Sequence, residues 1–340
     1  MQGPDRRGRR AAAGRGGRAT APGRRDRRAA SLARRGLSTA RPGRGLSARP
    51  IAAASRALCR EIREARRVGG GDINDAWRLT LDDGTPAFLK SRGDAPAGEY
   101  EREAAGLAWL TEAGGLQAPE VLAVVDDAKA PGLVLEWVEP GHMDSAGEEE
   151  LGRGLAATHA AGAERFDARP PGSPDRPLRF GGVELPDGTV PPGSAWATHY
   201  AARLETLSAV ALDSGRISPA CSARLERVCE RIDGLAGPPE SPARVHGDLW
   251  SGNVLADSIG RPWLIDPAAH GAHRELDLAM LELFGSVTAR THSSYAELKP
   301  LAEGYQDRVP LWQLQPLLVH AILFGGFYGA AVDRAASRYA

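Results

Sequence analysis

The sequence has little cysteine, very little lysine and no long hydrophobic run. Its 340 residues include three Cys, at positions 59, 221 and 229. They form no CxxC pair and no zinc ligand set, which argues against a disulfide framework and favours a reducing, cytoplasmic setting. No run reaches the roughly 18 apolar residues of a membrane span, so no membrane is expected as a partner. The longest apolar stretch, Leu317–Val332, contains His320 and three Gly and predicts a buried core helix.

Basic residues are almost all Arg, and they divide the chain into two parts of opposite charge. Residues 1–50 hold fifteen Arg against Asp5 and Asp26, a net charge of +13. The other 290 residues carry −13, from 28 Lys or Arg and 41 Asp or Glu. An acidic body is a poor general binder of nucleic acid, so that partner is expected only through residues 1–50.

Residues 1–50 are low-complexity Arg, Gly, Ala and Pro without an apolar period. Such a segment cannot bury enough surface to offset its ordering entropy. Three interpretations remain open: a disordered extension or misassigned start, a targeting peptide, or a basic arm that contacts nucleic acid. The predicted fold therefore begins at residue 51.

The rest of the chain predicts an α+β fold with two lobes, as a length of 340 residues also suggests. Residues 51–138 are predicted to form a lobe with an antiparallel sheet and a helix. Residues 139–340 are predicted to form a mostly helical lobe that contains one hairpin. The expected strands cover residues 76–81, 85–90, 121–125, 133–138, 254–257 and 262–265. The expected helices cover residues 51–65, 97–113, 151–161, 195–209 and 218–235.

The strongest chemical motif is the octapeptide His-Gly-Asp-Leu-Trp-Ser-Gly-Asn at residues 246–253. Asp248 and Asn253 have the D-x-x-x-x-N spacing of a kinase catalytic loop. In that loop the Asp accepts the substrate proton and the Asn holds Mg²⁺. His246 is more consistent with a structural role in bracing this loop than with a base.

Asp266 follows Asn253 by thirteen residues, across the predicted hairpin. Their midpoint falls between Ile259 and Gly260, so pairing about that point would set the two side chains opposite each other. A carboxylate and an amide oxygen at that separation suit a Mg²⁺ ion that also takes substrate phosphates. The alternative is a polar hairpin base with hydrogen-bonded caps.

A second group of candidate residues lies in the N-terminal lobe. Gly69, Gly70 and Gly71 precede a strand, so their N–H groups could approach phosphates closely, although an ordinary loop has the same pattern. Pairing about the Asp82-Asp83-Gly84 turn places Lys90 opposite Ala76, beside this glycine loop. There a Lys can hold nucleotide phosphates. The alternative is a solvated Lys at a strand end.

Glu103 falls on one helical face with Leu107 and Leu110. A carboxylate among apolar positions needs a charged partner, and Lys90 is the obvious one. Such a pair positions the Lys of kinases, whereas the alternative is a solvated Glu.

Two further segments have an expected place by their order along the chain. Glu136, Trp137 and Val138 would form the connection between the lobes that offers backbone groups to adenine, or else an ordinary strand end. Asp277 either caps its own helix or receives hydrogen bonds from the catalytic loop.

These motifs resemble the fructosamine kinase (ketosamine-3-kinase) family, in the wider aminoglycoside-phosphotransferase and choline-kinase-like group. The resemblance runs from about Val68 to Tyr339. It is carried by the segments GGGDIN, EYEREAAGL, VHGDLWSGNVLAD and LIDPAAHGAHRELDLAM. The HGDLxxxN pattern is shared by the whole group, whereas Trp250-Ser251-Gly252 and ExDLAM are more specific to this branch.

The resemblance implies a protein-kinase-like fold and transfer of a phosphoryl group from ATP, with Mg²⁺, to the 3-hydroxyl of a ketosamine. The ketosamine is a small molecule or a glycated protein, and its unstable 3-phosphate sheds the sugar, so the net effect is deglycation. The resemblance implies that Asp248 is the general base and that Asn253 and Asp266 bind Mg²⁺. It implies that Lys90, with Glu103 as its partner, binds the phosphates under a glycine loop of Gly69, Gly70 and Gly71. It also implies that Trp250 forms a wall of the sugar pocket.

The acceptor is less well specified than the catalytic residues. Residues 181–195 and the segment after Phe284-Gly285 depart from the family pattern, and both are expected to frame the acceptor site. A kinase of the same fold for an aminoglycoside, an amino alcohol or another sugar remains open. So does a nucleotide-binding pseudokinase that acts as an interaction module. The sequence does not specify the oligomeric state.

Overall fold

The computed structural model describes residues 48–69, 74–180, 183–185, 190–191, 193–285 and 288–340. The predicted Gly70 and Gly71 lie outside these residues.

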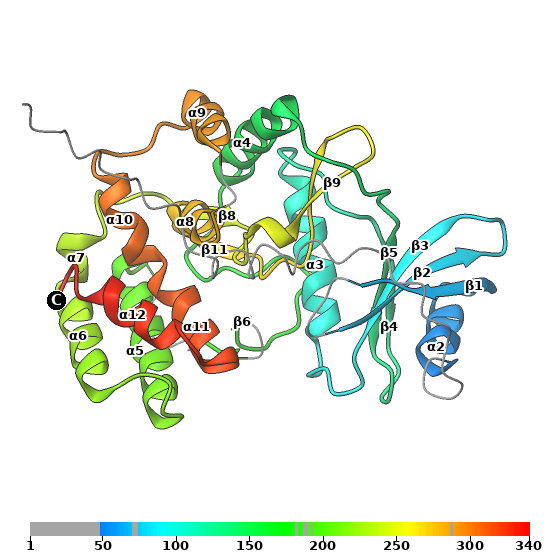
Figure 1. The fold of residues 1–340 in the computed structure, drawn as a ribbon. Helices are drawn as coiled ribbons and strands as arrows, with labels where there is room; N and C mark the ends of the chain where they lie inside the picture. The colour runs from blue at the N-terminus through cyan, green and yellow to red at the C-terminus, as the bar shows by residue number, and fades with distance from the viewer. Residues whose placement is uncertain (1–47, 70–73, 181–182, 186–189, 192, 286–287) are drawn as a thin grey trace, which may run out of the picture. The chain divides into compact units, whose positions relative to one another are not determined.

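A five-stranded antiparallel sheet occupies the N-terminal part of the described chain, with the strand order β1-β2-β3-β5-β4 (Figure 1). The strands are β1 Ile62–Arg67, β2 Asp75–Leu81, β3 Pro86–Ser91, β4 Val121–Val125 and β5 Gly132–Glu136. The predicted strands at 76–81, 85–90 and 121–125 are confirmed. β5 ends at Glu136, so Trp137 and Val138 lie just beyond it.

One helix packs on each face of this sheet, because side chains alternate between the two faces of a strand. Helix α2 (Ala48–Leu58) joins the apolar cluster that contains Val134 of β5. Helix α3 (Glu99–Glu112) joins the cluster that contains the neighbouring residues Leu133 and Leu135. The predicted helix over 97–113 is therefore confirmed, and Glu103 lies on its buried face with Leu107 and Leu110.

The predicted helix over residues 51–65 is wrong beyond Leu58. The chain leaves α2 through Cys59, which has φ 52, and then runs as the edge strand β1. The segment IREARR has good helix propensity, but each residue from Glu64 to Arg67 finds a partner on β2. Pairing with a neighbouring strand has overridden local propensity, and the charged residues suit an exposed edge.

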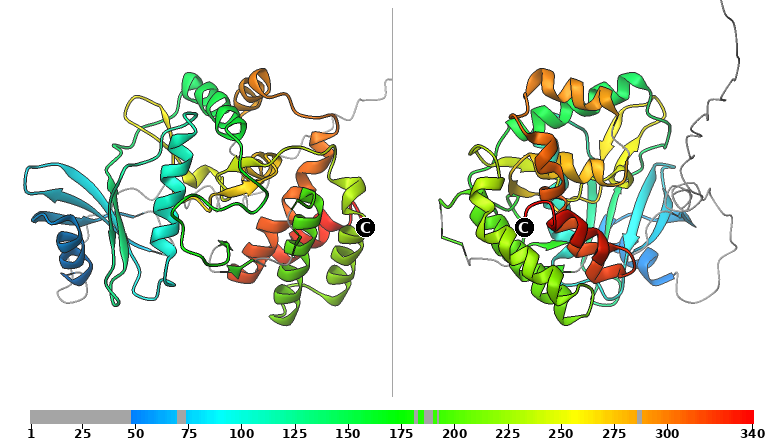
Figure 2. Two further views of the ribbon diagram at one scale, coloured as in Figure 1. Left: turned by 180° about the vertical axis from the view of Figure 1, so that it is seen from behind. Right: turned by 60° about the vertical axis from the view of Figure 1, so that its left-hand side comes forward.

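The C-terminal part is mostly helical, and in the views of Figure 2 its last two helices lie beside α5 and α6. Its helices are α4 Ser145–Ala160, α5 Trp196–Asp213, α6 Pro219–Glu230, α7 Ile232–Leu235, α8 Glu275–Leu283, α9 Ala289–Leu298, α10 Tyr305–Trp312, α11 Leu314–Phe324 and α12 Tyr328–Ala336. Its short strands are β6 Arg179–Phe180, β7 Val183–Glu184, β8 Ala243–Val245, β9 Val254–Ala256, β10 Pro262–Leu264 and β11 His270–Ala272. The predicted α+β class and two-lobed fold are confirmed.

The predicted single helix over residues 317–332 is wrong. The chain breaks at Gly325 and Gly326, both with φ 64, and forms α11 and α12 instead. None of the helices in the described ranges is long and apolar enough to cross a membrane.

The β9–β10 hairpin is held by one backbone hydrogen bond to the N-terminal part and by a second to the chain that leaves that part. The Leu264 N–H donates to the carbonyl of Gln117, between α3 and β4, at 2.8 Å. The Gly141 N–H, in the chain after β5, donates to the carbonyl of Ala256 at 2.8 Å. The hairpin and the residues at its open end therefore lie close to α3 and β3.

Candidate active site

Lys90 lies near the end of β3, opposite Ala76 of β2 as the sequence predicted. Its side chain is buried and forms ion pairs with Glu103 of α3 and with Asp266, whose Oδ1 lies 2.5 Å from the Lys90 Nζ. Burial alone would lower the pKa of Lys90, but the charges of Asp266 and Glu103 outweigh it and the pKa lies above its ordinary value. The ammonium group is therefore charged.

Glu103 has a weaker set of partners than Lys90. Its side chain is buried, one oxygen contacts Lys90, and Oε1 has no hydrogen-bond partner among the described residues. Burial raises the pKa of Glu103 to about 7, and the nearby negative charge of Asp266 acts in the same direction. The predicted pairing of Lys90 with Glu103 is present.

The register of the β9–β10 hairpin differs from the prediction by one residue. Val254 pairs with Leu264, and the Ile265 N–H donates to the carbonyl of Asn253 at 3.0 Å. Asn253 is therefore opposite Ile265, not Asp266. A slip of one residue normally turns a side chain to the other face of the sheet.

Asp266 still reaches the site because its backbone leaves the β region. It has φ 54, one of three non-glycine residues with positive φ among those described. Asp is among the few residues that tolerate this conformation. The turn directs its half-exposed carboxylate to Lys90.

The catalytic-loop candidates Asp248 and Asn253 contact each other directly. The Asn253 Nδ2 donates to the Asp248 carbonyl at 2.8 Å and to its Oδ2 at 3.1 Å. Burial, together with the nearby negative charge of Asp266, raises the pKa of Asp248 to about 7. Asp248 thus has a proton affinity suited to a general base near neutral pH.

Asp277 resolves the choice that the sequence left open, since it binds the backbone of the catalytic loop. Its carboxylate accepts hydrogen bonds from the N–H groups of His246, at 2.7 Å, and Gly247, at 2.9 Å. Burial would raise the pKa of Asp277, but the hydrogen bond from His159 and the charges around it outweigh burial and hold the pKa below its usual value. A buried, charged acceptor fixes the loop in one conformation.

His246 ties the loop to the end of the hairpin. Its Nε2 lies 2.9 Å from the Ile265 carbonyl, and its Nδ1 accepts the Asp248 N–H at 3.2 Å. This pairing requires the proton on Nε2, and burial lowers the pKa of His246, so the ring is neutral. The contacts fit a bracing residue.

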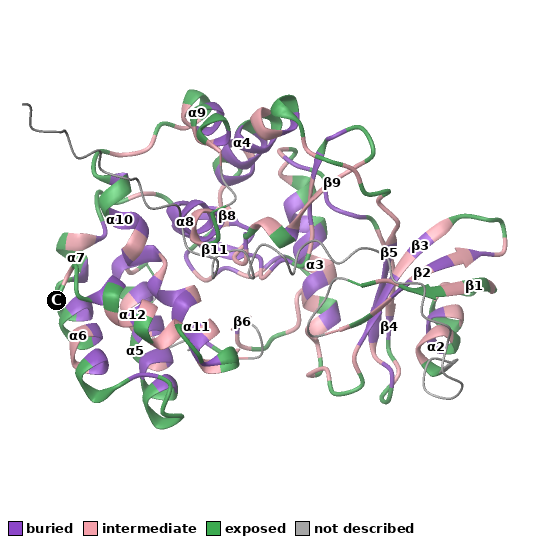
Figure 3. Cartoon of the chain, in the orientation of Figure 1, coloured by how far each residue is buried: buried purple, intermediate pink, exposed green. Residues whose placement is uncertain are grey.

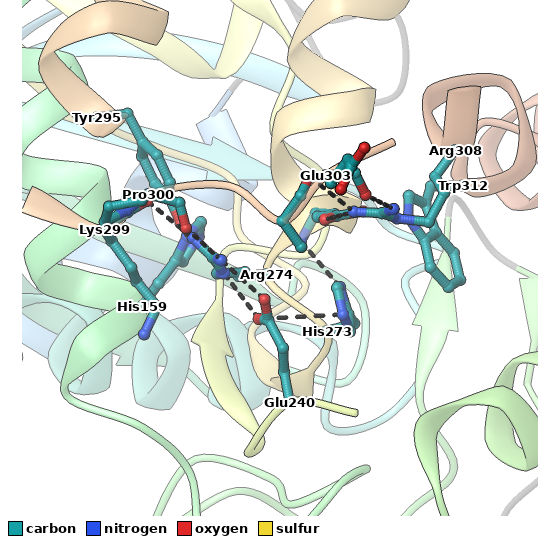
Figure 4. A network of polar contacts seen from close by, with 12 residues as sticks. His159, Glu240, His273, Arg274, Tyr295, Lys299, Pro300, Glu303, Arg308 and Trp312 are labelled. Carbon is teal, nitrogen blue, oxygen red and sulfur yellow. Dashed lines mark hydrogen bonds and ion pairs between the residues drawn. The ribbon is translucent and has the colours of Figure 1, made fainter. Parts of the chain in front are cut away.

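A polar network missed by sequence reasoning continues from Asp277 to His159 and Tyr295. Figure 4 shows His159 and Tyr295 with the neighbouring Arg274 and Glu240. The His159 Nε2 lies 3.2 Å from Asp277, and its Nδ1 lies 2.8 Å from the Tyr295 hydroxyl. Arg274 donates to that hydroxyl at 3.4 Å and forms a bidentate ion pair with Glu240. These residues lie far apart in the sequence, so no local pattern could have revealed them.

Trp250 lies on the catalytic loop, and its ring lies against the backbone of Gly252. The Trp250 N–H donates to the Asp248 carbonyl at 3.2 Å. A Cβ atom on Gly252 would lie 2.2 Å from the indole, so only glycine allows the backbone this close to the ring. The indole is partly exposed, and its edge meets Phe284 with a centroid distance of 5.8 Å.

The remaining predicted nucleotide contacts are only partly described. Gly69 precedes β2, whereas Gly70 and Gly71 fall outside the described residues. The Glu136 side chain accepts the Glu120 N–H at 3.0 Å, and the Trp137 Nε1 donates to Glu139 at 2.8 Å. Contact of Glu136, Trp137 and Val138 with adenine therefore stays a prediction.

The donor set around Asp266 fits Mg²⁺. Asn253 uses its amide nitrogen on Asp248, which leaves its Oδ1 as an acceptor. Within the described ranges, no group of three or more His, Cys, Asp or Glu side chains could hold a metal ion alone. Mg²⁺ is typically held by one or two protein oxygen ligands together with substrate phosphates, so a carboxylate and an amide oxygen are sufficient.

Comparisons with known proteins show which family this chain is similar to. The family model described as fructosamine kinase matches residues 49–339. A probable ketoamine kinase of Enterococcus faecium is 31% identical over 268 residues, which cover 78% of this chain and 92% of that protein.

Solved structures extend the similarity to the fold. A crystal structure from Thermobifida fusca, assigned to the fructosamine-3-kinases, is 40% identical and has a TM-score of 0.74, covering 85% of this chain and 98% of its own. A choline kinase from Streptococcus pneumoniae has a TM-score of 0.56 at 15% identity, covering 85% of this chain and 97% of its own. The choline kinase is similar in fold alone.

Proposed function

This chain belongs to the fructosamine kinase family and is a phosphotransferase acting on a hydroxyl group, and we propose that its acceptor is the 3-hydroxyl of a ketosamine. The ketosamine is carried by a small amine or by a protein. Because the resulting 3-phosphate is unstable and releases the sugar, the net effect of the reaction is deglycation.

The observation that carries the proposal is the meeting of two charged groups from separate parts of the chain. Lys90 comes from the sheet and Asp266 from the hairpin of the C-terminal part, and they lie 2.5 Å apart. Asp248 lies close enough for the Asp266 charge to raise its pKa. Phosphoryl transfer needs this kind of positioning and charge neutralisation more than it needs a covalent nucleophile.

Each residue then has one task. ATP supplies the γ-phosphoryl group, and Mg²⁺ neutralises the charge that develops on it. Lys90 holds the nucleotide phosphates, and Glu103 keeps the Lys90 side chain in place. Asn253 and Asp266 would hold Mg²⁺ through their oxygen atoms.

Asp248 would act as the general base. Its carboxylate accepts the proton of the acceptor hydroxyl as that oxygen bonds to the γ-phosphorus and the bond from phosphorus to the leaving oxygen breaks. Trp250, two residues further on, would form one wall of the sugar pocket.

A direct assay tests the proposal. The chain is incubated with Mg-ATP and fructosyl, ribulosyl or erythrulosyl amines, with kanamycin and choline as competing acceptors of the same fold group. Mass spectrometry follows phosphorylation of the acceptor. A phosphorylated ketosamine that then releases free amine is the expected result. Phosphorylation of kanamycin or choline alone would overturn the substrate, and an absence of product from all five would overturn the proposal.

A further inference from the structure

Exposed aromatic side chains gather at one place beside the catalytic loop. In the parts of the chain that the structure describes, nine large apolar side chains are exposed, and four of these are aromatic. All four belong to one continuous series of ring contacts, here called the aromatic strip. Its members are Trp250, Phe284, His320, Phe324, Phe327 and Tyr328.

The strip is continuous from the catalytic loop outward. Phe284 lies 5.8 Å from Trp250 and 5.4 Å from His320, measured between ring centroids. His320 then lies 5.0 Å from Tyr328, which lies 4.2 Å from Phe327. These separations are typical of aromatic pairs that stabilise each other.

The backbone presents the outer end of the strip to solvent. Helix α11 ends at Phe324, the chain turns through Gly325 and Gly326, and α12 begins at Tyr328. The end of α11 and the following turn are largely exposed (Figure 3). Phe324 is 55% exposed and Phe327 67% exposed, so two large rings face water without covering the core.

The middle of the strip carries no charge near neutral pH. Burial lowers the pKa of His320, and its Nδ1 lies 2.7 Å from the Pro316 carbonyl, which fixes a proton on that nitrogen. An uncharged series of rings favours apolar and aromatic groups, while the faces of its outer members can also attract a cation.

We propose that this aromatic strip binds the substituent on the amine nitrogen of the acceptor and selects small amines with an aromatic or branched apolar group. This inference rests on the proposed function, and it names the amine half of that substrate. In a ketosamine the nitrogen is separated from the reacting carbon by only two carbons. A substituent on it therefore leaves the pocket close to Trp250, where the strip begins.

A small amine fits the strip better than a peptide does. The strip consists of side-chain rings, and a peptide laid on it would lose hydrogen bonds between its amide groups and water. An alkyl or aryl substituent loses none, and it gains from removing apolar surface from water.

The test compares acceptors that share one sugar and differ in the amine. The ribulosyl and fructosyl adducts of methylamine and of 2-phenylethylamine are assayed with Mg-ATP, beside a peptide that carries the same sugar on a lysine. We expect kcat/KM for the phenylethyl adduct to be about tenfold higher, chiefly through a lower KM, because the strip is remote from the reacting atoms. In the variants Phe324→Ala and Phe327→Ala the ratio between the two adducts should fall toward one.

Leu298→Ala is the matched control. Leu298 is 59% exposed at the end of α9 and does not belong to the strip, so this variant should keep the wild-type ratio. Equal use of both adducts by the wild-type protein would overturn the inference but leave the proposed function standing. Phosphorylation of neither adduct would overturn both. Preference for a peptide with the same sugar on a lysine would overturn the assignment to small amines.

Discussion

Two hairpins deliver the two opposite charges of the candidate active site, and they do so differently. The β2–β3 hairpin supplies Lys90 from a regular ladder position, opposite Ala76. The β9–β10 hairpin supplies Asp266 from beyond its last pair, Val254 with Leu264, on a residue with φ 54. A charge carried on a regular strand can be placed by counting residues, whereas one carried on an irregular residue cannot.

The irregular backbone of Asp266 has a functional meaning. A residue in a sparsely populated backbone conformation costs stability and persists only where its surroundings hold it. Asp266 is held by its ion pair with Lys90 and by the hydrogen bond of the adjacent Ile265 N–H to Asn253. The irregular position is thus the one that joins the two parts of the site.

The strongest test of this comparison removes the charge of Asp266. In Asp266→Asn the side chain keeps its size and its tolerance of positive φ, but it loses the negative charge. We expect kcat/KM to fall about a thousandfold, because both the Mg²⁺ ligand and the partner of Lys90 are weakened. Steady-state kinetics with Mg-ATP measures the loss.

Asp257→Asn is the control, since Asp257 lies at the turn of the same hairpin and accepts the N–H groups of Ile259 and Arg261. It should change kcat/KM by no more than about twofold. Similar losses in both variants would mean that the hairpin fold, rather than the Asp266 charge, is what matters.

A smaller effect is expected at Glu103, the partner of the Lys90 side chain that the β2–β3 hairpin supplies. In Glu103→Gln, Lys90 keeps Asp266 but loses its second carboxylate, so its side chain is less well positioned. We expect a loss of about one to two orders of magnitude in kcat/KM, with an increased KM for ATP.

Glu101→Gln on the exposed face of the same helix is the control for Glu103→Gln, and it should behave as the wild type does. An unchanged KM for ATP in Glu103→Gln would contradict the positioning role.

The sequence predicted what regular geometry and motif spacing determine. The pairing of Lys90 with Ala76 follows from a two-residue period, and the proximity of Glu103 to Lys90 follows from a helical face. Asp248 and Asn253 were predicted from their spacing, and their side chains are in contact. These features depend on local rules that hold along the whole element.

The rest depends on tertiary contacts that no local pattern encodes. Strand β1 contradicts its helical propensity because β2 offers it partners. The contact of His159 with Tyr295 joins residues 136 positions apart. The second hairpin pairs one residue away from its predicted symmetric register, and the left-handed conformation of Asp266, which compensates for this, has no signal in the sequence.

A third prediction concerns β11, the strand that follows the second hairpin in the chain and pairs with β8. His270, on β11, is fully buried, and burial together with the charge of Arg203 lowers its pKa to about 4. The unfolded chain has a His pKa of about 6.5, so between these values the unfolded state binds more protons. The stability that depends on neutral His270 is fully present above about pH 6.5 and is lost as the pH falls toward 4.

We expect this one group to contribute a loss of about 3 kcal/mol in the free energy of unfolding between pH 6.5 and pH 4. Urea unfolding across that range measures it. In His270→Gln, which has no titratable group there, the decrease should be smaller by about that amount. An identical pH dependence in both proteins would contradict the assignment.

The smallest expected effect is a difference in stability between the Gly and Ala variants of each charged residue, Asp266 and Lys90. This difference compares the two backbone conformations. At position 266, where φ is 54, Gly should be more stable than Ala by about 1 kcal/mol, because a Cβ atom strains that conformation. At position 90, in a regular strand, Ala should be more stable than Gly by about 0.5–1 kcal/mol, because Gly loses more entropy on folding. Within each pair the lost ion pairs are the same, so the difference reports the backbone alone. The two differences are measured from the urea midpoints of four variants: Asp266→Gly, Asp266→Ala, Lys90→Gly and Lys90→Ala. The same sign of the difference at both positions would show that the two hairpins present their charges from equivalent backbones.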